Sequence, residues 1–314
     1  MMWGNQSSVT DFILAGFSSR PTVEVILFPL VLVMYIVTVT GNILIIVVVM
    51  IDPALQSPMY FFLRNLSFIE ICFTLDTIPK MLINLLLKNK SISFISCAIQ
   101  MFCFFYFGCA ECFILAAMSY DRYSAICNPL RYATVMSRSF CQKLLGGVWV
   151  IGIPVSLLQA GWIFNLPFCG SNEVNHFFCD APAVLKLVCS DTYPYEMQSI
   201  ASTLLFLVFP FVLILISYVR IITAILRMSS AESRRKAFST CSSHLIVVTL
   251  FYGSGSIVYL RPKSNYSPEI KKMLSLFYTV LTPMLNPIVY TLRNYEVKEA
   301  LKRTLGWKIF SQAT

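Results

Sequence analysis

Charged residues are scarce in this chain. They account for 12% of its 314 residues, whereas a typical soluble domain carries about 25%. A chain with so little charge lacks the polar surface that a water-soluble protein of this length needs. The composition therefore excludes an ordinary soluble enzyme or binding domain and favours a protein that lies in a lipid bilayer.

Histidine and the usual catalytic motifs are also lacking. The chain has two histidines, and it has no His-Glu-x-x-His zinc motif, Gly-rich phosphate loop or nucleophile elbow. A membrane enzyme needs a constellation of this kind. We therefore expect a protein that is not an enzyme and that carries no metal or other cofactor, a bound sodium ion excepted.

Long apolar runs, by contrast, fill the sequence. A membrane-spanning helix needs about 20 mainly apolar residues, and continuous runs of this length indicate helices rather than barrel strands. The sequence predicts an all-α membrane protein: one domain over residues 1–314, a bundle of seven transmembrane helices with a short amphipathic cytoplasmic helix after the seventh. The predicted helices span approximately residues 24–51, 58–86, 94–127, 140–164, 196–226, 237–260 and 270–292.

The distribution of lysines and arginines predicts which side of the membrane each end of the chain faces. Such residues concentrate in short cytoplasmic loops, and most of the 24 present lie on the inner side if the N-terminus is outside. We expect a multi-pass protein of the plasma membrane with residues 1–23 extracellular, a glycosylation sequon at Asn5 and a cytoplasmic tail over 293–314. A net charge of +9 placed in short loops suits membrane lipid and an acidic protein partner, not nucleic acid.

Four of the eleven cysteines fall on the outer, oxidising side. Cys97 opens the third predicted helix, and Cys169, Cys179 and Cys189 lie in the loop that follows the fourth. An even number of cysteines on this side favours disulfides, and four cysteines leave three connectivities open. A bond from Cys97 to a loop cysteine would hold the loop over the mouth of the bundle.

Two motifs mark the inner ends of helices three and seven. The third helix ends in Asp121-Arg122-Tyr123, and the seventh contains Asn286-Pro287-x-x-Tyr290. A proline inside a spanning helix frees a backbone carbonyl and bends the helix. Together the two motifs resemble those of the rhodopsin-like G-protein-coupled receptors.

Three further segments narrow the resemblance. They are Pro58–Leu63 at the start of helix two, His176–Asp180 in the long loop, and Lys236–His244 at the start of helix six. These segments look like those of the odorant receptors, and the resemblance runs from about Phe12 to Leu305. The alternatives are a non-olfactory receptor for a small lipid-like ligand, which these segments oppose, and a transporter, which would favour internal repeats that we do not find.

The resemblance implies a receptor that binds an odorant and activates a stimulatory, olfactory-type G protein to raise cyclic AMP. It implies disulfides between Cys97 and Cys179 and between Cys169 and Cys189. At rest Arg122 would pair with Asp121, and on activation it would turn to the G protein. The other residues of this implied switch are Tyr123, Tyr218, Asn286, Pro287 and Tyr290.

Glu70 and Glu111 lie inside apolar helices, where an ionisable residue suggests function. Two neighbouring carboxylates cannot both stay ionised cheaply, so the pair either shares a proton or binds a cation. The resemblance places Asn42 and Asn286 beside them, in the sodium pocket of the wider superfamily. The sequence leaves open whether the pair holds sodium or a proton.

The ligand pocket is expected in the outer halves of helices three, five, six and seven. Phe104 stands seven residues after Cys97, where amine receptors of the superfamily carry an aspartate. The pocket residues are mostly apolar with a few hydroxyls and no charge, which is typical of small-molecule sites and predicts a neutral, moderately apolar, volatile ligand. Helical spacing places these residues there: Phe104, Phe105, Gly108, Cys109, Ser202, Thr203, Phe206, Gly255, Ser256, Tyr259, Leu276 and Thr279.

Overall fold

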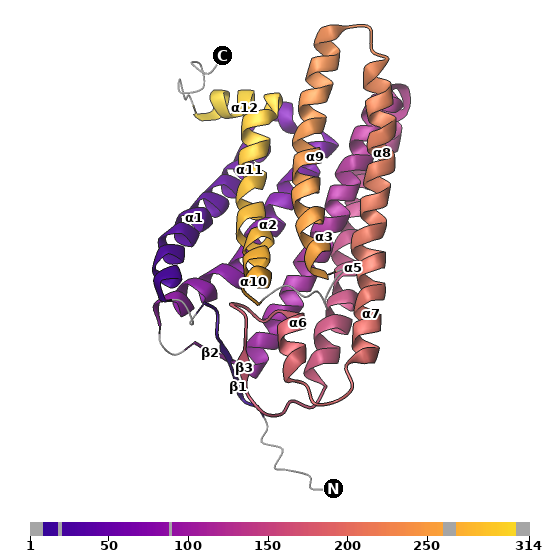
Figure 1. The fold of residues 1–314 in the computed structure, drawn as a ribbon. Helices are drawn as coiled ribbons and strands as arrows, with labels where there is room; N and C mark the ends of the chain where they lie inside the picture. The colour runs from indigo at the N-terminus through magenta and orange to yellow at the C-terminus, as the bar shows by residue number, and fades with distance from the viewer. Residues whose placement is uncertain (1–8, 18–20, 88–89, 260–267, 306–314) are drawn as a thin grey trace.

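A bundle of long, roughly aligned helices forms the molecule (Figure 1). The structure is a computed structural model and describes residues 9–17, 21–87, 90–259 and 268–305. The first four spans are α1 (Pro21–Ile51), α2 (Pro58–Leu86), α3 (Phe94–Cys127) and α5 (Arg138–Phe164). Short helical turns connect them or lie in the long loop: η1 (Pro53–Leu55), η2 (Pro129–Arg131), α4 (Tyr132–Val135), α6 (Ala181–Val184) and η3 (Leu185–Leu187).

The fifth and seventh spans each contain a π-helical turn. The fifth consists of α7 (Tyr193–Thr203), η4 (Leu204–Val208) and α8 (Phe209–Leu226), and the seventh of α10 (Pro268–Leu276), η5 (Phe277–Leu281) and α11 (Thr282–Arg293). Pro210 and Pro283 each lie two residues after the end of a turn. A proline cannot donate to the carbonyl one turn before it, and a wider turn accommodates the break.

The sixth span, α9 (Ala231–Tyr259), begins before the apolar run that starts at residue 237. Its first turns carry Glu232, Arg234 and Arg235, all exposed. Hydropathy detects only the part of a helix that lies in lipid, so it misses these polar turns. Figure 1 shows α8 and α9 projecting past the other helices at the end where α12 lies.

Membrane-spanning character is distributed unevenly over the helices. Among the described residues, six helices are long and apolar enough to cross a membrane, and α2 is not one of them. Four charged residues, Arg64, Glu70, Asp76 and Lys80, lie along α2. Because α2 packs between α1 and α3, it can carry these groups and still be the seventh helix of the bundle.

A short amphipathic helix, α12 (Tyr295–Leu305), follows the seventh span. Val297, Ala300 and Leu301 are buried against the bundle. The Arg303 guanidinium lies 2.8 Å from an Asp52 carboxylate oxygen in the loop after α1, and the pKa of Asp52 is lowered, chiefly by the Ala54 backbone N–H. The all-α seven-helix fold and its final amphipathic helix are thus confirmed.

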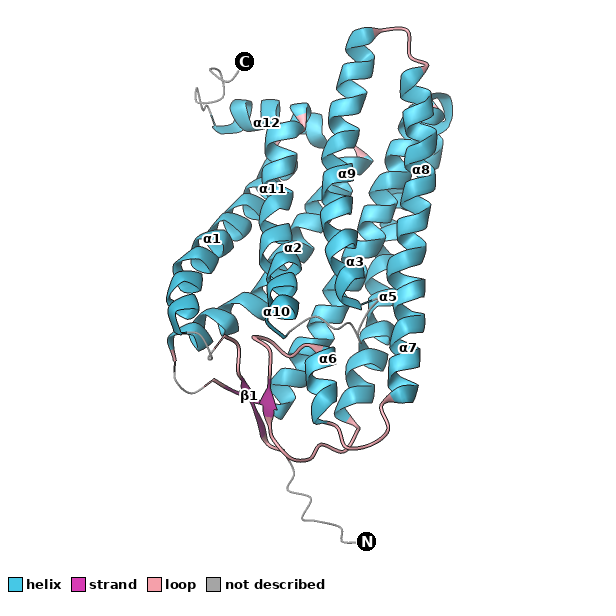
Figure 2. Ribbon diagram, in the orientation of Figure 1, coloured by secondary structure: helices cyan, strands magenta, loops and turns pink. Residues whose placement is uncertain are grey.

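A three-stranded sheet covers the opposite end, and the sequence did not predict it (Figure 2). Its order is β2 (Ser91–Ser93), β1 (Asp11–Leu14), β3 (Glu173–Val174), with β1 antiparallel to β2 and parallel to β3. Strands of two to four residues carry too little periodicity to be recognised from sequence. We call this end, which also holds the disulfides described below, the disulfide end, and the other the α12 end.

Close packing of α5 on α3 depends on Gly152. A Cβ at this position would lie 2.8 Å from the Tyr106 ring, whereas one at Gly161 on the same helix would meet nothing within 4 Å. Neighbouring rings hold the Tyr106 ring, including Phe102, with centroids 5.9 Å apart, and Trp149, also at 5.9 Å. The Tyr106 ring therefore has little freedom to retreat.

We expect Gly152→Ala to destabilise the protein by about 1–3 kcal/mol, the typical cost of overpacking. Gly161→Ala is the matched control and should be neutral or stabilise by up to about 1 kcal/mol, because alanine favours helix more than glycine does. The measurement is the thermal unfolding midpoint of each purified variant. Equal midpoints for the two variants would contradict this packing.

Candidate functional site

The long loop between α5 and α7 is tied down by two disulfides. Cys97 at the start of α3 bonds to Cys179, with a Cα–Cα distance of 5.5 Å, and Cys169 bonds to Cys189 at 5.9 Å. These are the two pairs that the resemblance implied. The first bond spans 82 residues of sequence and attaches the loop to α3, while the second closes a loop of 20 residues within it.

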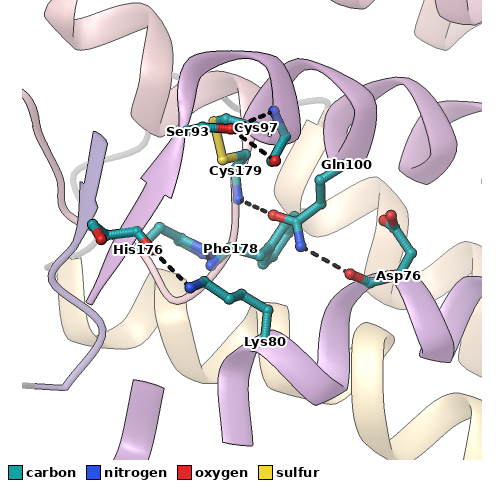
Figure 3. The surroundings of a disulfide bond; sticks show 10 residues. Asp76, Lys80, Ser93, Cys97, Gln100, His176, Phe178 and Cys179 are labelled. Carbon is teal, nitrogen blue, oxygen red and sulfur yellow. Dashed lines mark hydrogen bonds between the residues drawn. A yellow bond between two sulfur atoms is a disulfide. The ribbon is translucent and has the colours of Figure 1, made fainter. Parts of the chain in front are cut away.

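Gln100 reinforces the attachment of the loop to α3 (Figure 3). Its side-chain oxygen accepts a hydrogen bond from the Cys179 backbone N–H at 2.9 Å, and its amide donates to the Asp76 carbonyl on α2 at 2.9 Å. Gln100 thus joins α2, α3 and the loop. The sequence analysis did not single it out, because a glutamine near a helix end has no distinctive pattern.

A mostly apolar, partly open cavity of about 120 Å³ lies beneath this loop. No charged residue among those described lines it. Nine of the predicted pocket residues do: Phe104, Phe105, Gly108, Cys109, Ser202, Thr203, Phe206, Gly255 and Tyr259. The residues that the prediction missed are Phe73, Cys112, Val155, Gln159, Ser199, Leu207, Phe251 and Tyr278.

Ser256, Leu276 and Thr279 do not line the cavity, contrary to the prediction. The π-helical turn η5 shifts the angular phase of the seventh span, so Tyr278 reaches the cavity instead. The Thr279 hydroxyl donates to the Ser275 carbonyl of its own helix at 2.7 Å. Successive residues of a helix point about 100° apart, which turns Ser256 away when Gly255 faces inward.

A second cavity of about 220 Å³ lies beside the first, between α6, α7 and α9. Phe105, Ser199 and Tyr259 line both cavities. The Phe105 and Tyr259 ring centroids are 6.5 Å apart, so these two rings form part of the wall between the cavities. The second cavity also has charged lining residues, Lys186 and Glu196.

Hydrogen bonds connect the loop to the rings that line the first cavity. The Tyr259 hydroxyl donates to an Asp180 carboxylate oxygen at 3.3 Å and lies 3.4 Å from the Tyr278 hydroxyl. The Tyr278 hydroxyl donates to Ser275 at 3.3 Å, and His176 of the loop bonds to the same serine hydroxyl at 3.1 Å. A ligand that displaces either tyrosine ring must therefore disturb the loop.

Burial perturbs both titratable groups of this loop network. It raises the pKa of the Asp180 carboxyl to about 7. It lowers the pKa of His176 to about 3, with the charge of Lys272 adding to the effect. Near neutral pH His176 is uncharged, and Asp180 is poised to change its charge.

Farther down α3, Glu111 faces Glu70 of α2, and both are fully buried. The Asn286 amide donates to Glu70 Oε1. Among the described residues, Glu70 Oε2, Glu111 Oε1 and Asn286 Oδ1 have no hydrogen-bond partner. Asn42, also predicted for this site, donates its amide to the Thr38 carbonyl of its own helix at 3.0 Å. Three buried oxygens without donors suit a small cation or a shared proton.

Tyr252 links the floor of the cavity to the sixth span. Its hydroxyl donates to the Cys112 carbonyl of α3 at 2.9 Å, and Cys112 lines the cavity. The Tyr252 ring also stacks on Phe211 of α8, with centroids 5.0 Å apart. Movement of a ligand against α3 or α8 therefore acts directly on α9.

At the α12 end, Arg122 forms an ion pair with Asp121 at 3.1 Å. The other Asp121 oxygen accepts from the Tyr132 hydroxyl at 2.8 Å. Tyr123, the third residue of the motif, is half-buried and lies beside Tyr120, with ring centroids 6.4 Å apart. This is the pairing that the resemblance implies for the resting receptor.

The remaining predicted switch residues converge on the same region. The Tyr218 hydroxyl of α8 lies 2.6 Å from His244 Nδ1 of α9. Tyr290 is buried, and its hydroxyl has no hydrogen-bond partner in the described parts of the chain. Pro287 contacts α1 closely, because a Cβ at Gly41 would lie 2.9 Å from it. Tyr218 and Tyr290 thus offer hydroxyls at the end where Arg122 lies.

An open cavity of about 620 Å³ adjoins this region between α8, α9 and α11. Its lining combines apolar and basic side chains and includes Ile225, Phe238, Leu292, Arg234 and Arg235. A surface of this kind suits an amphipathic protein segment with acidic groups.

Comparison with known proteins identifies this arrangement in two steps. The crystal structure of squid rhodopsin superimposes with a TM-score of 0.74 at 20% sequence identity, over 93% of this chain and 88% of that one. The fold is therefore the seven-helix bundle of the rhodopsin-like, class A G-protein-coupled receptors.

The family follows from the sequence comparisons. A family model described as olfactory receptor matches residues 31–308. Human olfactory receptor 10A7 is 60% identical over 99% of both chains, and human olfactory receptor 10A5 is 57% identical over 97% of this chain and 96% of its own length. The chain belongs to the olfactory receptor family: it is a multi-pass membrane receptor and not an enzyme.

We expect Cys179→Ser to remove the receptor from the cell surface almost completely. Disulfides contribute about 2–5 kcal/mol, and closing the longer loop is worth about 1 kcal/mol more than closing the shorter one, so Cys169→Ser should be milder. The measurement is surface labelling of an N-terminally tagged receptor. Cys72→Ser, which changes a free cysteine, is the control. A Cys179→Ser receptor with normal surface level would contradict the role given to this bond.

We expect Asp180→Asn to gain stability relative to the parent as the pH rises from acid to mildly alkaline. The folded state raises the pKa of Asp180 above its unfolded value, so the parent loses stability as the pH rises toward about 7, whereas asparagine does not titrate. The contribution of His176 has the opposite sign and is common to both proteins. The measurement is the difference in thermal unfolding midpoint between Asp180→Asn and the parent, taken at several pH values. A difference that does not change with pH would refute the raised pKa of Asp180.

Proposed function

We propose that this receptor binds a small, neutral odorant in the 120 Å³ cavity beneath the loop and activates a stimulatory, olfactory-type G protein that raises cyclic AMP. The observation that carries the proposal is the lining of the cavity: it is mostly apolar, and the described residues that form it bear no charge. An ionised ligand there would lose its hydration without gaining an opposite charge.

The polar groups of the cavity support a ligand held mainly by shape. Ser202 already accepts a hydrogen bond from Gln198 at 2.7 Å, and Thr203 donates to the Ser199 carbonyl at 2.9 Å. Tyr195 donates to the Gln159 side chain at 3.0 Å. Few hydrogen-bonding groups remain for a ligand, which favours a molecule with one or two polar atoms.

The N-terminus is proposed to face the outside and the α12 end the cytoplasm of a cell, in the plasma membrane. The disulfides lie at the end with the sheet, and disulfides persist on the oxidising side of a membrane. Arg234, Arg235, Lys298 and Lys302 lie toward the other end, as basic residues do on the cytoplasmic side. The proposed glycosylation site, Asn5, lies outside the described residues.

The G protein is proposed to bind in the open cavity between α8, α9 and α11. Its apolar and basic lining suits an acidic, amphipathic segment, and Arg122 lies close to this end of the bundle. Release of Arg122 from Asp121 would free a cation for the partner. The switch is a two-state element that the odorant favours at one end and the G protein at the other.

The proposed function is tested by a cyclic-AMP reporter in cells that carry the receptor and an olfactory-type G protein. A chemically diverse panel of neutral volatiles, carboxylic acids and amines is applied, with surface level measured in parallel. Activation by neutral members supports the proposal. A receptor that responds to charged ligands alone, or that raises no cyclic AMP when a known agonist occupies it, would refute it.

We expect Gly108→Val to lower the potency of any agonist about ten-fold or more, because it fills the cavity that the ligand needs. A Cβ at Gly108 meets no atom within 4 Å, and Gly108 lines the cavity, so the variant should fold. Gly253 on α9 is equally free of neighbours and lies outside the cavity, which makes Gly253→Val the matched control. An equal loss of agonist potency in Gly108→Val and Gly253→Val would contradict the proposed ligand site.

We also propose that one monovalent cation, sodium or a proton, neutralises the Glu70–Glu111 pair. If the cation is sodium, replacing external and internal sodium by choline should shift agonist potency about three-fold or more, as typical for a coupled site, and Glu111→Gln should abolish that shift. If the carboxyls share a proton, sodium has no effect in either protein. Glu299→Gln, at a half-exposed position of α12, is the control. A sodium effect that survives Glu111→Gln would refute the site.

A further inference from the structure

A fourth cavity, separate from the proposed odorant and G-protein sites, lies at the α12 end beside α2 and α5. It has a volume of about 520 Å³ and forms where the loop after α1 meets the first turns of these two helices. Its polar lining comprises Gln56, Ser57, Arg64, Arg138 and Gln142, over an apolar base that includes Val49, Leu55 and Met136. No role discussed above uses it.

The cavity carries uncompensated positive charge. None of its described lining residues is acidic, and neither Arg64 nor Arg138 forms an ion pair within the described ranges. The nearby Asp52 is engaged by Arg303. The Arg64 guanidinium lies 5.7 Å from the Phe61 ring centroid, a cation–π arrangement that holds it at the cavity.

The N-terminus of α2 adds to this charge, whereas that of α5 is already capped by the Ser137 hydroxyl, which accepts from the Phe140 backbone N–H at 3.4 Å. Ser57 and Pro58 at the start of α2, and Arg138 at the start of α5, all line the cavity. The Ser57 side chain makes no capping hydrogen bond. The first N–H groups of a long helix favour a bound anion, so the arginines and the uncapped start of α2 select the same kind of ligand.

An apolar seam continues from the cavity toward the middle of the membrane. On α2, Phe61, Arg64 and Phe68 lie at helical spacing on one face. On α5, Trp149 lies on the face that begins at Arg138, and its ring centroid is 6.2 Å from that of Phe68. Phe68 is 50% exposed, and α2 and α5 meet each other at few positions although both pack along α3.

We propose that this cavity binds the phosphorylated headgroup of an anionic membrane lipid, whose acyl chains lie along the seam between α2 and α5. The seam favours a lipid over a free phosphate compound, because only a lipid has acyl chains that can pack along it. Anionic lipids concentrate in the cytoplasmic leaflet, where basic pockets between helices bind their headgroups. The inference rests on the proposed orientation and is independent of odorant and G-protein choice.

The test uses the full-length receptor purified in detergent, without odorant, and native mass spectrometry with phosphatidylinositol 4,5-bisphosphate as the probe. We expect Arg64→Gln/Arg138→Gln to weaken lipid binding about ten-fold or more, since each arginine near a headgroup is worth about 1 kcal/mol. Arg131→Gln/Arg227→Gln removes the same charge from exposed positions outside the cavity and should change binding little. Equal loss in the two double variants would overturn the proposal.

A second pair of variants controls for a loss of lipid binding that misfolding could cause. Gln142 is exposed and lines the cavity, whereas Ser139 is exposed on the same helix and does not. Gln142→Glu should weaken lipid binding strongly, and Ser139→Glu should leave it nearly intact. Unchanged binding in Gln142→Glu would contradict a headgroup in this cavity.

A competition arm distinguishes a lipid from a free phosphate compound. Inositol 1,4,5-trisphosphate carries the headgroup phosphates without acyl chains. We expect it to displace the lipid only at far higher concentration, because it cannot use the seam. Displacement at equal concentration would overturn the lipid assignment and leave a site for soluble phosphates.

Discussion

A single constraint governs this receptor: in a bilayer every backbone polar group must find its partner within the chain. The constraint makes the spans helical and leaves side chains as the main carriers of specific chemistry. Much of that chemistry gathers on α3. From Cys97 to Arg122 this one helix holds the disulfide to the loop, the wall of the ligand cavity, the buried Glu111 and the ion pair of the switch.

The two ends of the bundle communicate through contacts that α3 shares with its neighbours. Cys112 lines the cavity and accepts the hydroxyl of Tyr252 on α9, one residue after Glu111. A ligand that shifts this part of α3 therefore acts at once on the sixth helix and on the carboxyl pair. The loop is coupled as well, since Tyr259 joins the cavity to Asp180. Few contacts separate the proposed odorant site from the proposed switch, although the distance is that of a membrane.

Hydropathy and short motifs were enough to predict the seven spans and the family, because lipid imposes long apolar runs and the motifs are specific. Helical spacing placed nine of the twelve predicted residues correctly at the cavity, but a break in helical phase was not predictable. The turn η5 brings Tyr278 to the cavity in place of Leu276 and Thr279, and no property of those residues signals it. The sheet formed by β1, β2 and β3 arises from segments far apart in sequence, each too short to predict alone.

The small size of the ligand cavity has a consequence for timing. A space of about 120 Å³ admits few heavy atoms, and the binding free energy of a ligand is limited by their number. With a micromolar dissociation constant and an on-rate of about 10⁶ M⁻¹s⁻¹, a complex lasts about one second. A receptor that binds its proposed odorant in this cavity with such an affinity can follow changes in odorant concentration on a scale of seconds.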